Sequence, residues 1–324
     1  TIMLVRFWGT RGSLPAPLNH AAVRGKIHRA LSAAEGRDLS TSEKIDAFID
    51  GELGFDIAGT YGGNTSCVEI DPGGDEYVIC DLGSGVREFG NNFLIAPDPG
   101  KKKIFNIFIS HPHWDHIMGF PFFVPAYIPG HTIRIHGCHQ VLEECLRRQA
   151  DDPGFPVNFD MLGADIEFAT MEPGQRYDVA GLGVVALKQI HHGDSYGYRF
   201  EAGGKAVVYS TDSEHKLDSD EETKIFTDFF KSADLVIFDA MYALADAVSL
   251  KQDWGHSSNI VGVELCQRAG VKHYCMFHHE PVHGDTTLGN ILAETIRYDE
   301  IIDEGEAGHE FKISTAYDGM EIQL

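Results

Sequence analysis

The pattern of strand-like and helix-like segments along this chain predicts an α/β fold of four layers (αββα), in which two β-sheets pack face to face and helices cover the two outer surfaces. Short apolar runs of strand length fall into two groups along the 324 residues, and helical segments follow each group. No linker and no low-complexity segment separates the two groups. We therefore expect residues 1–324 to form a single domain.

Most of the strands are predicted from apolar runs that are bounded by turn residues. The first, at 2–8, leads into a glycine-rich loop at 9–15 that lacks the lysine of a phosphate-binding P-loop. The remaining predicted strands lie at 66–70, 77–80, 104–109, 133–135, 165–169, 183–187, 196–200, 206–209, 235–238 and 274–277. The helices of this framework are predicted from about 86 onward and at 139–149, 221–231, 257–269 and 288–302.

Residues 20–58 interrupt this framework and are predicted to form a helical insertion. Residues 21–34 have helical composition, and Ser40-x-x-Glu43 has the pattern of a capping box before a second helix that stops at Gly51. The insertion contains four apolar residues that need a surface to bury against, which are Leu31, Ile45, Phe48 and Ile49. We therefore expect it to lie beside the mouth of the active site or at the interface of a homodimer.

The composition disfavours several classes of protein. With histidines counted as neutral, the formal net charge is −23, whereas proteins that bind long nucleic acids usually present a basic face. The only basic run is Lys101-Lys102-Lys103, so DNA or tRNA is disfavoured as a partner. A small phosphodiester remains compatible, because bound metals would neutralise its charge. No apolar run reaches about 18 residues, so we expect no contact with a membrane through a spanning helix.

Six cysteines are scattered through the chain without any Cys-x-x-Cys pair. Most of them fall within apolar strand or helix patterns, so we expect buried free thiols. Free thiols fit a reducing cytoplasm best, and a periplasmic location is the alternative.

Three histidines and one carboxylate fall within six positions, directly after the predicted strand 104–109. Alternate side chains of an extended segment share a side, so His111 and His113 can bind one ion together. Asp115 and His116 come one turn later and can face a second ion beside the first. Neutral imidazoles with a carboxylate suit zinc, and also manganese or iron. The alternative without a metal is a histidine-rich surface loop.

Three further donors stand at the ends of predicted strand patterns, where side chains can converge on one edge of a sheet. They are His191, Asp212 and His278. His191 and His278 are each followed directly by another histidine, so His192 and His279 are alternative ligands. If they are not ligands, we expect these two histidines to lie beside the site. Asp212 has the alternative role of a helix cap.

The segment from His111 to His116 matches the His-x-His-x-Asp-His motif of the metallo-β-lactamase superfamily. The chain resembles its ribonuclease Z-like and phosphonate-pathway phosphodiesterase branch from Phe7 to His283, apart from 20–58. The likeness includes Gly-Thr-x-Gly-Ser at 9–13 and the Asp81-x-Gly pattern. It implies an αββα sandwich with a metal site along one edge of the two sheets.

The resemblance also implies a ligand set for two divalent metal ions. On this basis His111, His113 and His191 hold the first metal, Asp115, His116 and His278 hold the second, and Asp212 bridges both. Asp81 is expected to orient a ligand histidine from outside the ligand set.

In relatives of the ribonuclease Z type, a histidine and an acidic residue form an acid pair near the leaving group. The matching positions are His256, before the predicted helix, and Asp239, at the end of a predicted strand. This chain departs from the family by having aspartate where glutamate is usual. The alternative role of His256 is that of a simple residue at the start of a helix.

These features predict a di-metal hydrolase. We expect a phosphodiesterase that acts on a small or cyclic phosphodiester through a hydroxide shared by the two metals. Asp115 would also orient the nucleophile, and His256 with Asp239 would protonate the leaving group. The alternatives are a tRNA 3′-processing endonuclease like ribonuclease Z, a lactonase or esterase, and a non-catalytic or redox metal protein.

Overall fold

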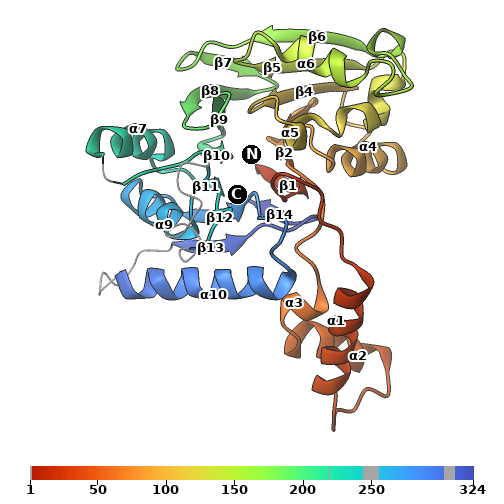
Figure 1. Ribbon diagram of the computed structural model, residues 1–324, viewed down its shortest axis with the longest axis vertical. Coiled ribbons are helices and arrows are strands. Elements are labelled where there is room, and N and C mark those ends of the chain that lie inside the picture. Colours follow the sequence, from red (N-terminus) through yellow and green to blue (C-terminus); the bar gives the residue numbers. More distant parts are fainter. Residues whose placement is uncertain (1, 218, 244–254, 303–310) are drawn as a thin grey trace.

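The computed structural model describes residues 2–217, 219–243, 255–302 and 311–324, and it confirms the predicted four-layer sandwich. Two seven-stranded sheets lie face to face with helices on their outer sides (Figure 1). The first sheet has the order β14 (Glu321–Gln323), β1 (Leu4–Gly9), β2 (Cys67–Asp71), β3 (Tyr77–Cys80), β4 (Ile104–Ile109), β5 (Thr132–Gly137) and β6 (Asp165–Thr170). The second has the order β13 (Lys312–Thr315), β12 (His273–Phe277), β11 (Leu235–Asp239), β10 (Lys205–Ser210), β9 (Ser195–Ala202), β8 (Leu182–Gln189) and β7 (Arg176–Val179).

The helices cover the outer faces of the two sheets. The first sheet is covered by α4 (Val86–Ile95) and α6 (Leu142–Gln149), and the second by α7 (Asp220–Phe230), α9 (Asn259–Arg268) and α10 (Asp285–Ile302) (Figure 1). A one-turn helix, α5 (Trp114–Ile117), follows β4. Within the described part of the chain, every helix is too short or too polar to cross a lipid bilayer.

Strands that are buried on both faces explain why their sequences contain continuous apolar runs. In β4, Phe108 faces the core between the two sheets, whereas Phe105 and Ile107 face the core beneath α4. In β11, Ile237 faces the core between the sheets and Phe238 faces the core beneath the outer helices. The sandwich therefore has three apolar layers, one between the sheets and one on the outer side of each.

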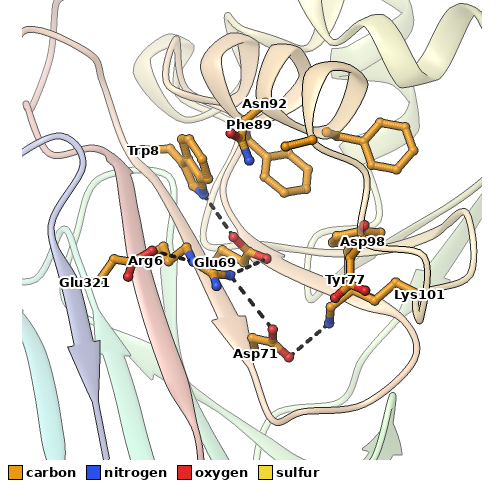
Figure 2. Close-up of a pocket in the computed structure, with 12 residues that line it drawn as sticks. Arg6, Trp8, Glu69, Asp71, Tyr77, Phe89, Asn92, Asp98, Lys101 and Glu321 are labelled. Carbon is orange, nitrogen blue, oxygen red and sulfur yellow. Dashed lines mark hydrogen bonds and ion pairs between the residues drawn. The ribbon is translucent and has the colours of Figure 1, made fainter.

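The outer face of β1 and β2 carries paired charges at the edge of the first sheet. Arg6 lies between its cross-strand neighbours, with Nη1 3.3 Å from Glu69 Oε1 and Nε 2.7 Å from Glu321 Oε1 (Figure 2). Nearby, Lys101 Nζ lies 2.9 Å from Asp71 Oδ1. These residues line a cavity of about 300 Å³ beside α4. Because their charges pair with one another, we assign them a structural role in joining β14, β1 and β2.

Residues 20–58 form three helices that project from the sandwich as an arm (Figure 1). They are α1 (His20–Ala33), α2 (Ser42–Glu52) and α3 (Phe55–Ala58). Of the four apolar residues expected to bury, only Phe48 does so; Leu31, Ile45 and Ile49 are 70%, 40% and 36% exposed. Within the single chain these three side chains find no surface to bury against, because the arm extends away from the body of the protein, and their burial at a dimer interface stays a prediction. The assignment of a single domain with an insertion stays a prediction.

The capping residue of α2 differs from the predicted one by one position. Thr41, not Ser40, is the N-cap, and its side chain accepts a hydrogen bond from the backbone N–H of Lys44. The helix also continues through Gly51 to Glu52. A glycine near a helix end is tolerated at a cost of about 1 kcal/mol, so it does not have to end the helix.

A buried ion pair fastens the arm to the body of the protein. Lys26 Nζ of α1 lies 2.6 Å from Asp285 Oδ2 at the start of α10. The other oxygen of Asp285 accepts hydrogen bonds from the backbone N–H of Tyr61 at 2.9 Å and from Thr60 Oγ1 at 3.2 Å. The pair therefore joins the arm, the following loop and α10 at one point.

We predict that Asp285→Asn lowers the free energy of unfolding by about 3 kcal/mol, because it leaves the Lys26 ammonium without its buried counter-charge. Urea denaturation of the purified variant measures this. The control is Asp38→Asn, which removes the partner of Lys44 in an exposed pair of the same arm and should have no measurable effect. Equal stability of the two variants would show that the buried pair does not hold the arm.

Candidate metal centre

The candidate metal centre lies at the edge of the sandwich where strands of both sheets end. In the first sheet, His111 follows the end of β4. In the second sheet, Asp212 follows β10, Asp239 ends β11 and His278 follows β12. Since these three strands are parallel neighbours, their carboxyl ends meet at one edge and bring the three side chains together.

Three histidines form what we call the first donor group, which consists of His111, His113 and His191. His113 Nδ1 lies 2.9 Å from His111 Nε2 and 3.2 Å from His191 Nε2. Burial lowers the pKa of each of the three imidazoles, so the neutral form is favoured. A neutral imidazole carries only one proton on its two ring nitrogens, so the three nitrogens that converge here cannot all be paired by hydrogen bonds with one another. A cation that accepts a lone pair from each of them fits the arrangement.

Four residues form the second donor group, which consists of Asp115, His116, Asp212 and His278. His116 Nε2 and His278 Nε2 each lie 3.2 Å from Asp115 Oδ2. Burial opposes ionisation of Asp115 and Asp212, yet the nearby imidazoles hold the pKa of both carboxyls well below the usual range. Burial also opposes the charged form of His116, but the carboxylates raise its pKa well above normal. A divalent cation would replace the proton that these carboxylates attract to the site.

The carboxylate of Asp212 faces both donor groups. Its Oδ2 lies 3.6 Å from both His111 Nε2 and His191 Nε2. Its Oδ1 lies 3.2 Å from both His116 Nε2 and His278 Nε2. One oxygen is thus directed to each group, which is the geometry that a bridging carboxylate requires.

Three of the residues at this edge have left-handed backbone conformations. Asp81, Asp212 and His278 have φ values of 62°, 50° and 59°. Each costs about 1–2 kcal/mol in an L-residue. Conformations of this kind gather at functional sites, where the surrounding structure holds them in place.

Asp81 supports the second donor group by binding the nitrogen of His116 that points away from the other donors. One of its oxygens accepts hydrogen bonds from His116 Nδ1 and Tyr209 OH, both at 2.7 Å. Its other oxygen accepts from the backbone N–H of Ser110 at 2.8 Å. Because His116 donates through Nδ1, its Nε2 would offer a lone pair to a cation that replaces the proton attracted by the carboxylates. This agrees with the role that the Asp81-x-Gly resemblance implies.

Two residues of the glycine-rich loop also shape the site, although sequence reasoning did not assign them roles. The backbone N–H of Ser13 donates to Asp115 Oδ2 at 2.7 Å. Gly12 packs against the His278 ring so closely that a Cβ there would lie 2.5 Å from it. The glycines of the loop were the available signal, since glycine often marks a place where backbone approaches another group closely.

The structure separates the members of the two histidine doublets. His191 and His278 lie in the donor groups. His192 lies outside all of the donor clusters of the described residues, and His279 is buried and hydrogen-bonded through Nε2 to the Ala316 carbonyl at 2.8 Å. The geometry therefore favours His191 and His278, while the role of all seven candidates as metal ligands stays a prediction.

A histidine–aspartate pair stands next to the donor groups. Asp239 Oδ2 lies 2.8 Å from His256 Nδ1, and the His256 ring stacks on that of His278 with centroids 5.1 Å apart. Burial works to lower the pKa of His256, but the charge and hydrogen bond of Asp239 raise it to about 9. His256 does not itself open the helix, because the N-cap of α9 is Ser258. Its approach to the site comes from the loop before that cap.

The donor chemistry fits a pair of divalent ions. Imidazole and carboxylate ligands are typical of zinc and also suit manganese and iron. The first group would hold one ion, the second group another, and Asp212 would touch both.

The fold and this cluster of histidines and aspartates define a hydrolase of the metallo-β-lactamase type. Residues 68–279 match the family model described as the β-lactamase superfamily domain. Because the match covers most of the chain, this protein belongs to the metallo-β-lactamase superfamily.

Comparisons with individual proteins place the chain among several members of that superfamily. Ribonuclease Z from Haloarcula marismortui is 20% identical over 315 residues, which cover 81% of this chain and 91% of that protein. The metallo-β-lactamase fold protein YhfI from Bacillus subtilis has a TM-score of 0.64 at 17% identity, over 100% of this chain and 99% of its own. A diphosphatase of the PhnP family has a TM-score of 0.60 at 18% identity, over 99% of this chain and 98% of its own. At these identities the structural likeness shows the fold alone.

We predict that purified protein holds two divalent ions per chain and that Asp212→Ala loses at least one of them, because the change removes a ligand from both groups. Activity should fall by about 100-fold or more, since even outer partners of metal ligands contribute 10- to 100-fold. Elemental analysis and a phosphodiester assay measure the two effects. Asp234→Ala is the control, because this buried aspartate lies at the opposite end of β11. A variant at Asp212 with both ions and full turnover would contradict the bridging role.

Proposed function

We propose that this protein is a di-metal phosphodiesterase that hydrolyses a small or cyclic phosphodiester. The observation that supports this most is the His256–Asp239 pair, which is not part of the first or second donor group but lies against both, with His256 Nδ1 4.0 Å from Asp212 Oδ2. Ester, lactone and phosphodiester hydrolysis would all use the same metals. A dedicated acid beside them matters when the leaving group is a basic alkoxide, such as a ribose oxygen. We favour a phosphodiester over an ester or lactone because His256 and Asp239 stand at the positions of the acid pair in ribonuclease Z-like relatives.

The metals would supply Lewis acidity at phosphorus and an activated water, and zinc is the ion we propose. The protein supplies the remaining steps. Asp239 accepts from His256 Nδ1 and thereby keeps the imidazolium form. His256 then donates the proton on Nε2 to the leaving oxygen as the phosphorus–oxygen bond breaks. Asp115, with one oxygen fixed by the Ser13 N–H, orients the attacking water.

A second candidate is a tRNA 3′-processing nuclease, which the sequence likeness to ribonuclease Z supports. We rank it below the small-substrate activity because the formal net charge of −23 opposes a long polyanion. A purified protein that cleaves precursor tRNA and no small diester would reverse this order.

We also propose a cytoplasmic location. A homodimer stays a proposal as well. All six cysteines are free thiols, and Cys67, Cys80, Cys266 and Cys275 are buried. Free thiols are typical of a reducing compartment.

We predict that His256→Ala lowers kcat for a cyclic nucleotide by about 100- to 10,000-fold but spares most of the activity on bis-p-nitrophenyl phosphate. The nucleotide loses a basic alkoxide, whereas p-nitrophenolate leaves without help. The control is His192→Ala, which removes an exposed histidine outside the donor clusters. Equal losses on both substrates would indicate that His256 positions phosphate instead of donating a proton.

The same role predicts a pH dependence. Because Asp239 raises the pKa of His256 to about 9, the acid form predominates at neutral pH and is lost as pH rises through that value. Bound cations would shift the pKa downward, so the alkaline limb of kcat/KM for a cyclic nucleotide should lie at or below about pH 9. The limb should be absent in His256→Ala. A variant that keeps it would assign the limb to another group.

A further inference from the structure

Three large apolar side chains are exposed on the segments 9–15, 113–118 and 278–283, which carry or support the metal donors. Trp114 stands between His113 and Asp115 and is 79% exposed. Leu14 follows Ser13, whose N–H binds Asp115, and is 58% exposed. Val282 lies four residues after His278 and is 79% exposed. Each therefore lies within four residues of a metal donor or of a residue that binds one, although exposure of a tryptophan or leucine to water is unfavourable.

Hydrogen bonds fasten the segments 9–15, 113–118 and 278–283 to one another. The N–H of Gly12 donates to the carbonyl of His279, and the N–H of His279 donates to the carbonyl of Thr10, both at 3.0 Å. Arg11 Nη1 donates to the carbonyls of His283 at 2.7 Å and Glu280 at 3.3 Å. With Ser13 bound to Asp115, the backbones beneath the three apolar side chains form one connected support.

The charges on these loops restrict what they can hold. Arg11 is the only lysine or arginine in 9–15, 113–118 and 278–283. Arg11 as a whole is 2% exposed, and its Nε and Nη1 donate to backbone carbonyls. It is therefore not directed to a second phosphate of a substrate. The side chains of these three described segments favour an uncharged organic group over a polyphosphate or a nucleic-acid backbone.

We propose that Leu14, Trp114 and Val282 form an apolar rim that holds the non-leaving organic group of the diester, and that this group is aromatic. Trp114 would stack on it, as indole does on a nucleobase or an aryl ring, while the phosphorus lies at the donor groups. This assignment rests on the proposed phosphodiesterase function and narrows its substrates to diesters that carry such a ring.

The test compares two diesters with the same leaving group. Thymidine 5′-(p-nitrophenyl phosphate) and methyl p-nitrophenyl phosphate both release p-nitrophenolate and differ in the group that remains on phosphorus. Stacking on Trp114 predicts that Trp114→Ala raises KM for the thymidine ester by about 10- to 100-fold. The effect on the methyl ester should be below about threefold. Trp114→Phe should restore most of the selectivity, because a ring remains.

Two controls make the outcome specific. The metal content of Trp114→Ala reports whether the adjacent ligands remain in place. Ile95→Ala removes an apolar side chain that is 84% exposed on α4 and should leave the ratio of the two KM values unchanged.

Failure of the rim assignment and failure of the proposed function give different results in this test. If wild-type protein hydrolyses both esters but Trp114→Ala changes both KM values equally or not at all, the rim assignment is overturned and the phosphodiesterase proposal stands. If wild-type protein with two metals hydrolyses neither ester, the proposed function is overturned and the rim assignment falls with it.

Discussion

The carboxylate of Asp212 is the constraint on which the rest of the site depends. Each of its oxygens faces a different set of imidazoles, at 3.6 Å on one side and 3.2 Å on the other. This placement requires β10 to end at the same edge as β4 and β12, which belong to different sheets. The sandwich therefore has to be packed correctly before the two donor groups can meet. The positive φ of Asp212 indicates that the surrounding structure stabilises an otherwise unfavourable backbone conformation.

Two kinds of residue hold the site in place: some hydrogen-bond its histidines directly, and others bind the loops around it. Asp81 holds His116 from within the first sheet, and Asp239 holds His256 from within the second. Further out, Arg11 and the backbone of 9–15 fasten the loops through carbonyl groups. The substrate that such a site accepts can change with the side chains on the loops, while the metal donors stay in the same positions. We therefore expect substrate choice to depend on loop residues such as Trp114 more than on the metal donors.

Sequence patterns were most informative where the determining interactions are local. The strand at 104–109 was predicted with the bounds that β4 has, because a strand buried on both faces is a continuous apolar run. The strands β7, β13 and β14 were missed, since they are short and only partly buried, and only their pairing partners define them. In the arm, the helical pattern was recognised, but the exposure of Leu31 and Ile49 depends on where the arm projects. Composition does not determine that direction.

The same distinction applies to the site. His111, His113, Asp115 and His116 are close in sequence, so their spacing alone indicated a metal site. The choice of His278 over His279 depended on which side chain the end of β12 directs toward Asp212. The contact of Ser13 with Asp115 joins residues that are about 100 positions apart, and the glycines of the loop indicate a close approach without identifying its partner.

The most direct test of this account is anomalous diffraction at the zinc edge from crystals of zinc-loaded protein. We predict two peaks about 3.5–4 Å apart, one on each side of the Asp212 carboxylate, with His111, His113 and His191 at one and Asp115, His116 and His278 at the other. A single peak, or two peaks that do not share Asp212, would contradict it.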